Sequence, residues 1–281
     1  MFAALSCDPL VPSYFLTDAP YSLLRQSRID PRRRQADGWG IGWFAYGDPQ
    51  IEKSPKPVYS EISHLKRAAQ KASGNALIGH VRWASNPLKL PKHELLGCAH
   101  TQPFTHGGWI FAHNGTLLIP REIETALGPW KKYVKGKNDS EILFYWLMKT
   151  AVPHLRRDPV KAIQAGMHGI DLIWQKCRKS YPIHKFPYHG LNWVLTNGRE
   201  LYAFCFCTPE GFDKNGALID KKKPYYQLHM KSGRGHVIIA SEPLDRDGEW
   251  EPFSHGQLIT AKLGAHIDVA KYRVRFSVDK N

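Results

Sequence analysis

The chain has 281 residues, 42% of them apolar, and 39 Lys and Arg against 25 Asp and Glu give it a formal net charge of +14. A chain of this composition can bury a sizeable core, which excludes a disordered protein, and its charge favours acidic partners or polyanions. Five cysteines without paired spacing argue against a disulfide framework or a zinc site: Cys7, Cys98, Cys177, Cys205 and Cys207. No segment reaches the roughly 18 apolar residues of a membrane span and no secretory signal is evident, so we expect a cytoplasmic protein without metal or cofactor.

The first half of the chain alternates short apolar segments with one helical pattern. Strands are predicted, in chain order, over residues 2–6, 41–46, 76–83 and 109–113. Ile62, Leu65 and Ala69 recur at helical spacing, which predicts a helix over residues 60–72. The basic run at residues 32–34 is interpreted as a solvated loop.

Two helices are predicted in the middle of the chain. An apolar face with a period of 3.6 residues predicts the first over residues 140–155, and Asn138, Asp139 or Ser140 can cap its start. The second is predicted over residues 160–177.

The last third of the chain has the composition of strands. They are predicted over residues 191–196, 201–207, 236–241, 257–260 and 273–278. The Asn197-Gly198 pair predicts a hairpin turn between the first two of them. Two groups of strands with helices between them favour a layered α+β fold, which we expect to form a single domain over residues 1–281.

Five short segments place polar, small and aromatic residues at predicted strand ends and turns. They are DGWG at 37–40, HVRWAS at 80–85, AHTQPF at 99–104, HNG at 113–115 and NDSE at 138–141. Each alone has an ordinary structural explanation, since an Asn-Gly pair forms turns and Asp139 can simply cap its helix. His100 can equally be a hydrogen-bonded structural histidine, and Arg82 can be half of an ion pair. Their order and spacing are more specific than any one of them.

In this order the five segments resemble the class II glutamine amidotransferases, above all the small stand-alone type that includes the γ-glutamyl hydrolase of the ergothioneine pathway. The similarity continues through residues 192–199 and 237–244 and so covers nearly the whole chain. The resemblance implies a four-layer α/β/β/α sandwich of the N-terminal-nucleophile hydrolase type, which hydrolyses the side-chain amide of glutamine or a γ-glutamyl amide. In that family a cysteine follows the initiator Met, its thiol attacks the amide carbon, and its own α-amine serves as base.

The resemblance also assigns roles to individual residues. Arg82 would pair with the α-carboxylate of the substrate, and Asp139 would accept from its α-ammonium group. The side-chain amide of Asn114 and the backbone N–H of Gly115 would form the oxyanion hole. The other substrate-binding residues that it implies are Asp37, Gly38, Trp39, Trp83, Ser85 and His100.

The second residue departs from the family pattern, because Phe2 stands at the nucleophile position and has no nucleophilic atom. Either amide hydrolysis is lost, or the mature protein begins at a different residue. Cys7 would lie about 16 Å further along an extended strand and on the opposite face from Phe2. Cys98 is internal and lacks a terminal amine, and it is better explained as a small buried hydrophobic residue.

Three functions therefore stay open. The first is a class II amidotransferase-like domain that binds glutamine or a γ-glutamyl amide, with hydrolysis lost at Phe2. The second is a non-catalytic ligand-sensing or partner subunit, which could work with a synthase or another protein. The third is binding of nucleic acid or an acidic protein through residues 32–34 and 221–223, although these basic runs are short and no nucleic-acid module is recognised. No membrane partner is expected.

Overall fold

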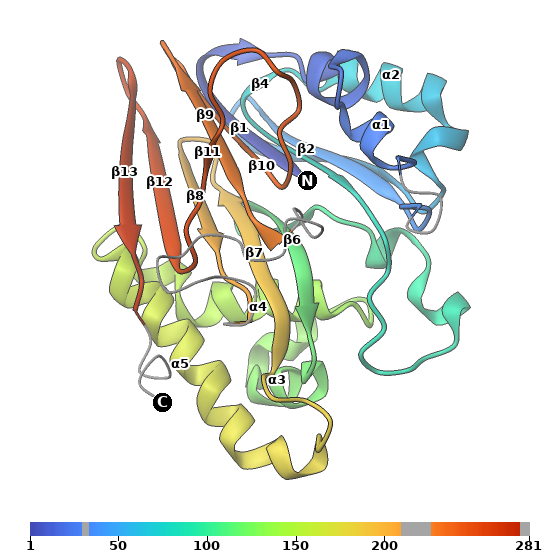
Figure 1. Ribbon diagram of the computed structural model, residues 1–281, viewed down its shortest axis with the longest axis vertical. Helices are drawn as coiled ribbons and strands as arrows, with labels where there is room; N and C mark the ends of the chain where they lie inside the picture. Colours follow the sequence, from blue (N-terminus) through green and yellow to red (C-terminus); the bar gives the residue numbers. More distant parts are fainter. Residues whose placement is uncertain (30–33, 209–225, 276–281) are drawn as a thin grey trace.

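The fold is layered, with two antiparallel sheets packed face to face and helices on the outer face of each (Figure 1). The structure, a computed structural model, describes residues 1–29, 34–208 and 226–275. This arrangement confirms the predicted α/β/β/α order of layers. No helix within those ranges is both long and apolar enough to cross a membrane.

The first sheet has seven strands in the order β11-β9-β10-β1-β4-β2-β3. Their bounds are β1 Phe2–Leu10, β2 Trp39–Ala45, β3 Asp48–Ser54, β4 Gly74–Val81, β9 His229–Gly233, β10 His236–Ala240 and β11 Glu251–Pro252. Strand β1 lies in the interior of this sheet, with Phe2 opposite Ala240 of β10 on one side and Gly79 of β4 on the other. The N-terminus therefore lies in the middle of the molecule, as Figure 1 shows.

The second sheet has six strands in the order β13-β12-β8-β7-β6-β5. Their bounds are β5 Phe104–His106, β6 Trp109–Leu117, β7 Tyr188–Thr196, β8 Glu200–Cys205, β12 Gln257–Leu263 and β13 Ile267–Arg273. The pairing of β6 with β7 sets Asn114 opposite Asn192 and Gly115 opposite Leu191. The HNG motif thus belongs to a strand and not to a turn.

The helices fall into two groups. Helices α1 (Leu23–Gln26) and α2 (Ile62–Lys71) cover the first sheet, whereas α3 (Pro120–Ala126), α4 (Asp139–Thr150) and α5 (Pro159–Cys177) cover the second. A π-helical turn spans Tyr14–Asp18, and 3-10 turns span Val58–Ser60, Lys92–Leu95, Cys98–His100, Gly128–Tyr133, Val152–His154 and Arg178–Ser180. The predicted cap of α4 is confirmed, since the Asn138 side chain accepts a hydrogen bond from the Ser140 N–H at 2.8 Å.

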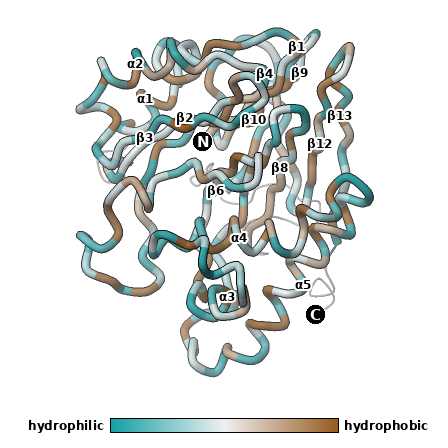
Figure 2. Tube along the Cα trace, turned by 180° about the vertical axis from the view of Figure 1, so that it is seen from behind, coloured by the Kyte–Doolittle hydropathy of each residue, from teal (hydrophilic) through white to brown (hydrophobic). Residues whose placement is uncertain are grey.

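Side chains of β1 alternate between two of the three apolar cores. Ala3 and Leu5 belong to the core between the sheets, while Phe2 and Ala4 belong to the core under α1 and α2. This period of two is the ordinary geometry of a strand. Figure 2 shows apolar residues interspersed with polar ones along the central strands.

Several element predictions are confirmed and others are wrong. The helices predicted over 60–72 and 160–177 match α2 and α5. The helix predicted over 140–155 ends at Thr150 instead, because Pro153 follows and proline cannot continue a helix.

The last strand was predicted over residues 273–278, whereas β13 ends at Arg273. Residues 276–278 lie outside the described residues, as do two of the three arginines at 32–34 and all of 221–223.

Candidate active site

A cavity of about 540 Å³ opens at one end of the two sheets. Met1, Arg82 and Ser241 line it from the first sheet, and Asn114 and Gly115 line it from the second. Strands β4 and β10 flank β1, so the residues that follow Val81 and Ala240 meet beside the start of β1. Four of the five motifs of the sequence contribute residues to the lining of this cavity, all but DGWG.

The first residue of the chain lies in this wall. The Met1 amine donates a hydrogen bond to Ser241 Oγ at 3.1 Å, and the Met1 carbonyl accepts one from the Ser241 N–H at 3.0 Å. Burial lowers the pKa of this amine to about 5, and the negative charge of Glu242 opposes the shift. An amine with this pKa is largely neutral at neutral pH.

The Phe2 side chain, by contrast, points away from the cavity. It is completely buried under α1 and α2, with its ring centroid 5.4 Å from that of Phe15. Gly79 leaves room for this ring, because a Cβ at that position would collide with it. Met1 lines the cavity, and its side chain belongs to the core between the sheets, on the opposite face of β1 from Phe2.

Arg82 is the main positive group of the cavity wall. Its Nη1 donates to the carbonyl oxygens of Leu95 at 2.8 Å and Asp37 at 3.2 Å. No hydrogen bond within the described residues uses its Nε or Nη2 donors. Burial lowers the pKa of the guanidinium, which the nearby charges of Asp37 and Asp139 oppose, but an arginine stays charged at any relevant pH. Arg82 can therefore offer two parallel donors to a carboxylate.

Asp139 lies behind the wall and holds one of its residues in place. Its Oδ1 accepts from Ser85 Oγ at 2.6 Å and its Oδ2 from the Leu117 N–H at 2.8 Å. Asp139 is only 2% exposed, and Ser85 is the member of this pair that lines the cavity. A cationic group of a ligand would thus contact Ser85, and the negative charge of Asp139 would attract it from behind Ser85.

Gly115 is required by close approach of two strands. A Cβ at this position would overlap the carbonyl oxygen of Gly190 on β7, so no other residue fits without moving the backbone. Together with Asn114 it lines the cavity opposite the end of β1. This corner supplies an amide side chain and backbone polar groups next to Met1.

A buried histidine network supports that corner, and we did not expect it from the sequence. Because the Gly190 carbonyl can only accept, His113 donates to it through Nε2 at 3.1 Å, and His113 Nδ1 then accepts from Ser140 Oγ at 3.0 Å. Gln102 Oε1 accepts from the His113 N–H at 2.6 Å, and its Nε2 donates to the His113 carbonyl at 3.0 Å. Burial lowers the pKa of His113, with Asp139 opposing. His113 and Gln102 belong to the HNG and AHTQPF motifs, so the sequence did mark these residues, although not the hydrogen bonds between them.

Comparison with known proteins decides the family. The family model for class II glutamine amidotransferases matches residues 24–279. The chain belongs to the class II glutamine amidotransferases. The gamma-glutamyl-hercynylcysteine sulfoxide hydrolase of Mycobacterium tuberculosis is 32% identical over 243 residues, which are 85% of this chain and 82% of that protein.

Solved structures agree on the fold. A glutamine aminotransferase class-II domain protein from Silicibacter pomeroyi superposes with a TM-score of 0.62 at 18% identity, covering 97% of this chain and 99% of that one. The glutamine phosphoribosylpyrophosphate amidotransferase of B. subtilis gives 0.63 at 14% identity, over 98% of this chain and 49% of that one. These likenesses confirm the predicted N-terminal-nucleophile hydrolase type of fold.

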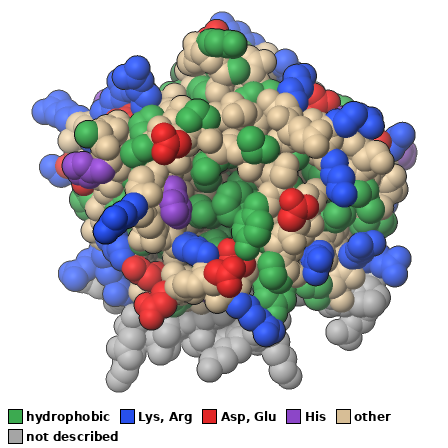
Figure 3. All heavy atoms as spheres, turned by 90° about the horizontal axis from the view of Figure 1, so that it is seen from above, with side chains coloured by type: hydrophobic (Ala, Val, Ile, Leu, Met, Phe, Trp, Pro, Cys, Tyr) green, Lys and Arg blue, Asp and Glu red, His purple; other side chains and the backbone are tan. Residues whose placement is uncertain are grey.

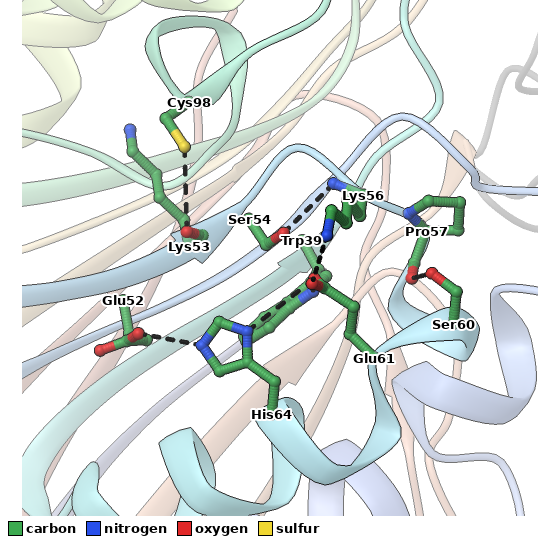
Figure 4. Close-up of polar contacts among 10 residues, drawn as sticks. All are labelled: Trp39, Glu52, Lys53, Ser54, Lys56, Pro57, Ser60, Glu61, His64 and Cys98. Carbon is green, nitrogen blue, oxygen red and sulfur yellow. Dashed lines mark hydrogen bonds and ion pairs between the residues drawn. The ribbon is translucent and has the colours of Figure 1, made fainter.

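In this member of the family the DGWG motif supports the cavity wall without lining it. Asp37 Oδ2 accepts from the Ala84 N–H at 2.9 Å and so fixes the segment after Arg82. Gly38 adopts a φ of +128°, which glycine tolerates and other residues rarely adopt. Trp39 is buried under α2 with its Nε1 donating to Glu61 at 3.1 Å (Figure 4), so it lies away from the expected pocket.

The two remaining residues that were expected in the pocket, Trp83 and His100, differ in the same way. Trp83 is 53% exposed and lines the cavity. His100 is not among the residues that line it: its Nδ1 accepts from the Lys137 N–H at 3.2 Å, and its carbonyl accepts from Asn138 Nδ2 at 2.6 Å. His100 therefore braces the loop before α4.

Neither cysteine considered as a substitute nucleophile is near the cavity. Cys7 Sγ lies 4.0 Å from the Ala265 carbonyl, at the other end of β1. Cys98 Sγ lies 4.0 Å from the Lys53 carbonyl (Figure 4). Cys98 is exposed, so its interpretation as a buried hydrophobic residue was wrong.

Proposed function

We propose that the cavity binds the γ-glutamyl group of glutamine or of a γ-glutamyl amide. The α-carboxylate pairs with the unused donors of Arg82, and the amide oxygen lies at the corner formed by Asn114 and Gly115. Ser85, held by Asp139, receives the α-ammonium group. The observation that carries the proposal is the convergence of Arg82 and this corner on one cavity of about 540 Å³, within the usual size range for small-molecule sites.

We propose binding without hydrolysis, because neither of the first two residues can act as an N-terminal nucleophile. Met1 lines the cavity but its thioether cannot form an acyl-enzyme, and the ring of Phe2 is buried on the other face of the strand. The protein then acts by binding its ligand, as a ligand sensor or as a subunit of a larger complex in the cytoplasm. Because the mycobacterial relative is named for a γ-glutamyl substrate, a γ-glutamyl amide is as suitable a ligand as glutamine.

Binding of a polyanion has less support. On the face shown in Figure 3, Lys and Arg side chains lie scattered around the edge with Asp and Glu among them. Electrostatic binding of nucleic acid needs a continuous basic surface along the phosphate backbone. The described residues offer no such surface on this face.

Calorimetry tests the proposal directly. Wild type, Arg82→Lys and the matched surface variant Arg67→Lys are titrated with glutamine, glutamate and a γ-glutamyl amide; Arg67 is exposed on α2. Because Lys cannot reproduce the two parallel donors of Arg82, we expect binding to weaken about tenfold or more in Arg82→Lys and to be unchanged in Arg67→Lys. Failure of all three ligands to bind folded wild type would exclude the proposal.

An assay of glutamate release tests the catalytic part separately. The expected result is no release from glutamine above that of the Arg82→Lys sample. Release that depends on Arg82 would show that hydrolysis persists and that some other group acts as the nucleophile.

A further inference from the structure

The cavity has two charged sides. In the order of the sheet, β10 and β4 flank β1, so Glu242 and Arg82 follow strands on either side of Met1. Neighbouring strands lie about 4.8 Å apart, which puts the backbones that carry Glu242 and Arg82 roughly 10 Å from each other. A ligand held by Arg82 can therefore extend past Met1 towards Glu242.

Glu242 has no cationic side chain to balance it. Within residues 1–29, 34–208 and 226–275, no lysine or arginine forms an ion pair with this carboxylate, and it accepts no side-chain hydrogen bond. The Arg82 charge is compensated elsewhere, by Asp37 and Asp139. Burial raises the pKa of Glu242, and the only opposing charge is the Met1 amine, which is itself largely neutral at neutral pH.

A half-buried carboxylate without a partner is unfavourable, and a bound cation would relieve that cost. With a volume of about 540 Å³, the cavity also lies in the size range that holds ligands larger than glutamine. Space and charge thus remain on the Glu242 side after a γ-glutamyl group has occupied the Arg82 side.

We propose that the amine portion of the γ-glutamyl amide carries a positive charge, and that Glu242 binds it. This inference rests on the proposed function and adds to it the class of ligand: an amide between the γ-carboxyl of glutamate and a cationic amine, in preference to free glutamine. Arg82 then selects the anionic end and Glu242 selects the cationic end, so a ligand must match the cavity in both charge and length.

Three γ-glutamyl amides of nearly equal length isolate the effect of the charge at the far end of the amine portion from the effects of size and of the γ-glutamyl group. They are made with 1,4-diaminobutane, pentylamine and 4-aminobutyrate, whose far ends are an ammonium, a methyl and a carboxylate group. We expect the ammonium compound to bind wild type about tenfold or more tighter than the methyl compound, and the carboxylate compound to bind most weakly. This comparison needs no variant, so it stays decisive if a substitution impairs folding.

Two variants then locate the effect. Glu242→Gln should abolish the preference for the ammonium compound, whereas Glu249→Gln, which removes the same charge from an exposed position, should retain it. Equal binding of all three amides to wild type would overturn the inference and leave the proposed function standing. If none of them binds and glutamine also fails, the proposed function falls and the inference falls with it. A preference that survives Glu242→Gln would assign the cation to another group and overturn the role of Glu242.

Discussion

Replacing Phe2 by cysteine should destabilise the protein without making it a hydrolase. Position 2 is where the family pattern places the nucleophile, yet the Phe2 side chain is fully buried against Phe15 and faces away from the cavity. Deleting a buried phenylalanine side chain to Ala costs about 3–5 kcal/mol, and the thiol fills only a small part of the space. We therefore expect Phe2→Cys to lower the free energy of unfolding by about 3 kcal/mol.

Gly79 provides an internal check on this packing. A Cβ at Gly79 would collide with the Phe2 ring, so Gly79→Ala should cost about 1–3 kcal/mol in wild type. In the Phe2→Cys background the ring is gone, and the added methyl group should be tolerated. The double-mutant cycle should thus show a coupling of about 1 kcal/mol or more, in the direction that favours the double variant.

Urea unfolding followed by tryptophan fluorescence measures these changes, since the chain has nine tryptophans. Leu172→Cys, at a position that is 43% exposed on α5, is the control and should change stability by no more than about 0.5 kcal/mol. Glutamate release from Phe2→Cys should stay at the background level. A Phe2→Cys protein as stable as wild type, or one that hydrolyses glutamine, would refute the assignment of Phe2 to the buried face.

Three further predictions follow from the site. Gln102→Leu should cost about 2–4 kcal/mol in urea unfolding, because the N–H and C=O of buried His113 lose their partners. Thermal stability should rise from pH 5 to 8. Burial lowers the pKa values of the Met1 amine, His80 and His113, so the unfolded chain binds more protons than the folded protein in this window. A melting temperature that does not change with pH would contradict this. Burial raises the pKa of Glu242, with the Met1 amine opposing, so the affinity for the ammonium-bearing amide should fall as the pH drops through that pKa, while the affinity for the methyl compound changes less.

The sequence predicted the layers and part of the site well. Arg82, Asn114 and Gly115 were expected together because their motifs recur in one order in a known family, and all three line the cavity. Trp39 and His100 were expected there as well, but a motif does not state which face of a strand or loop a side chain occupies. Strand alternation and the packing of α2 decide that, and both depend on contacts distant in sequence.

The same limit applies to Phe2, whereas two strands of the first sheet were missed for a different reason. A difference of one residue moves a side chain to the other face of a strand, so the sequence alone could not place Phe2 against α1 and α2 and Met1 against the cavity. Strands β3 and β9 were missed because their sequences, DPQIEKS and HMKSG, are largely polar. Strand pairing forms them where local propensity is weak.

A crystal structure of the protein with a bound γ-glutamyl amide would show directly whether Arg82, Asn114 and Gly115 hold the ligand. We expect the α-carboxylate within hydrogen-bonding distance of Arg82 Nε and Nη2, and the amide oxygen at Asn114 and Gly115. A ligand bound elsewhere, or bound in this cavity with its carboxylate away from Arg82, would contradict it.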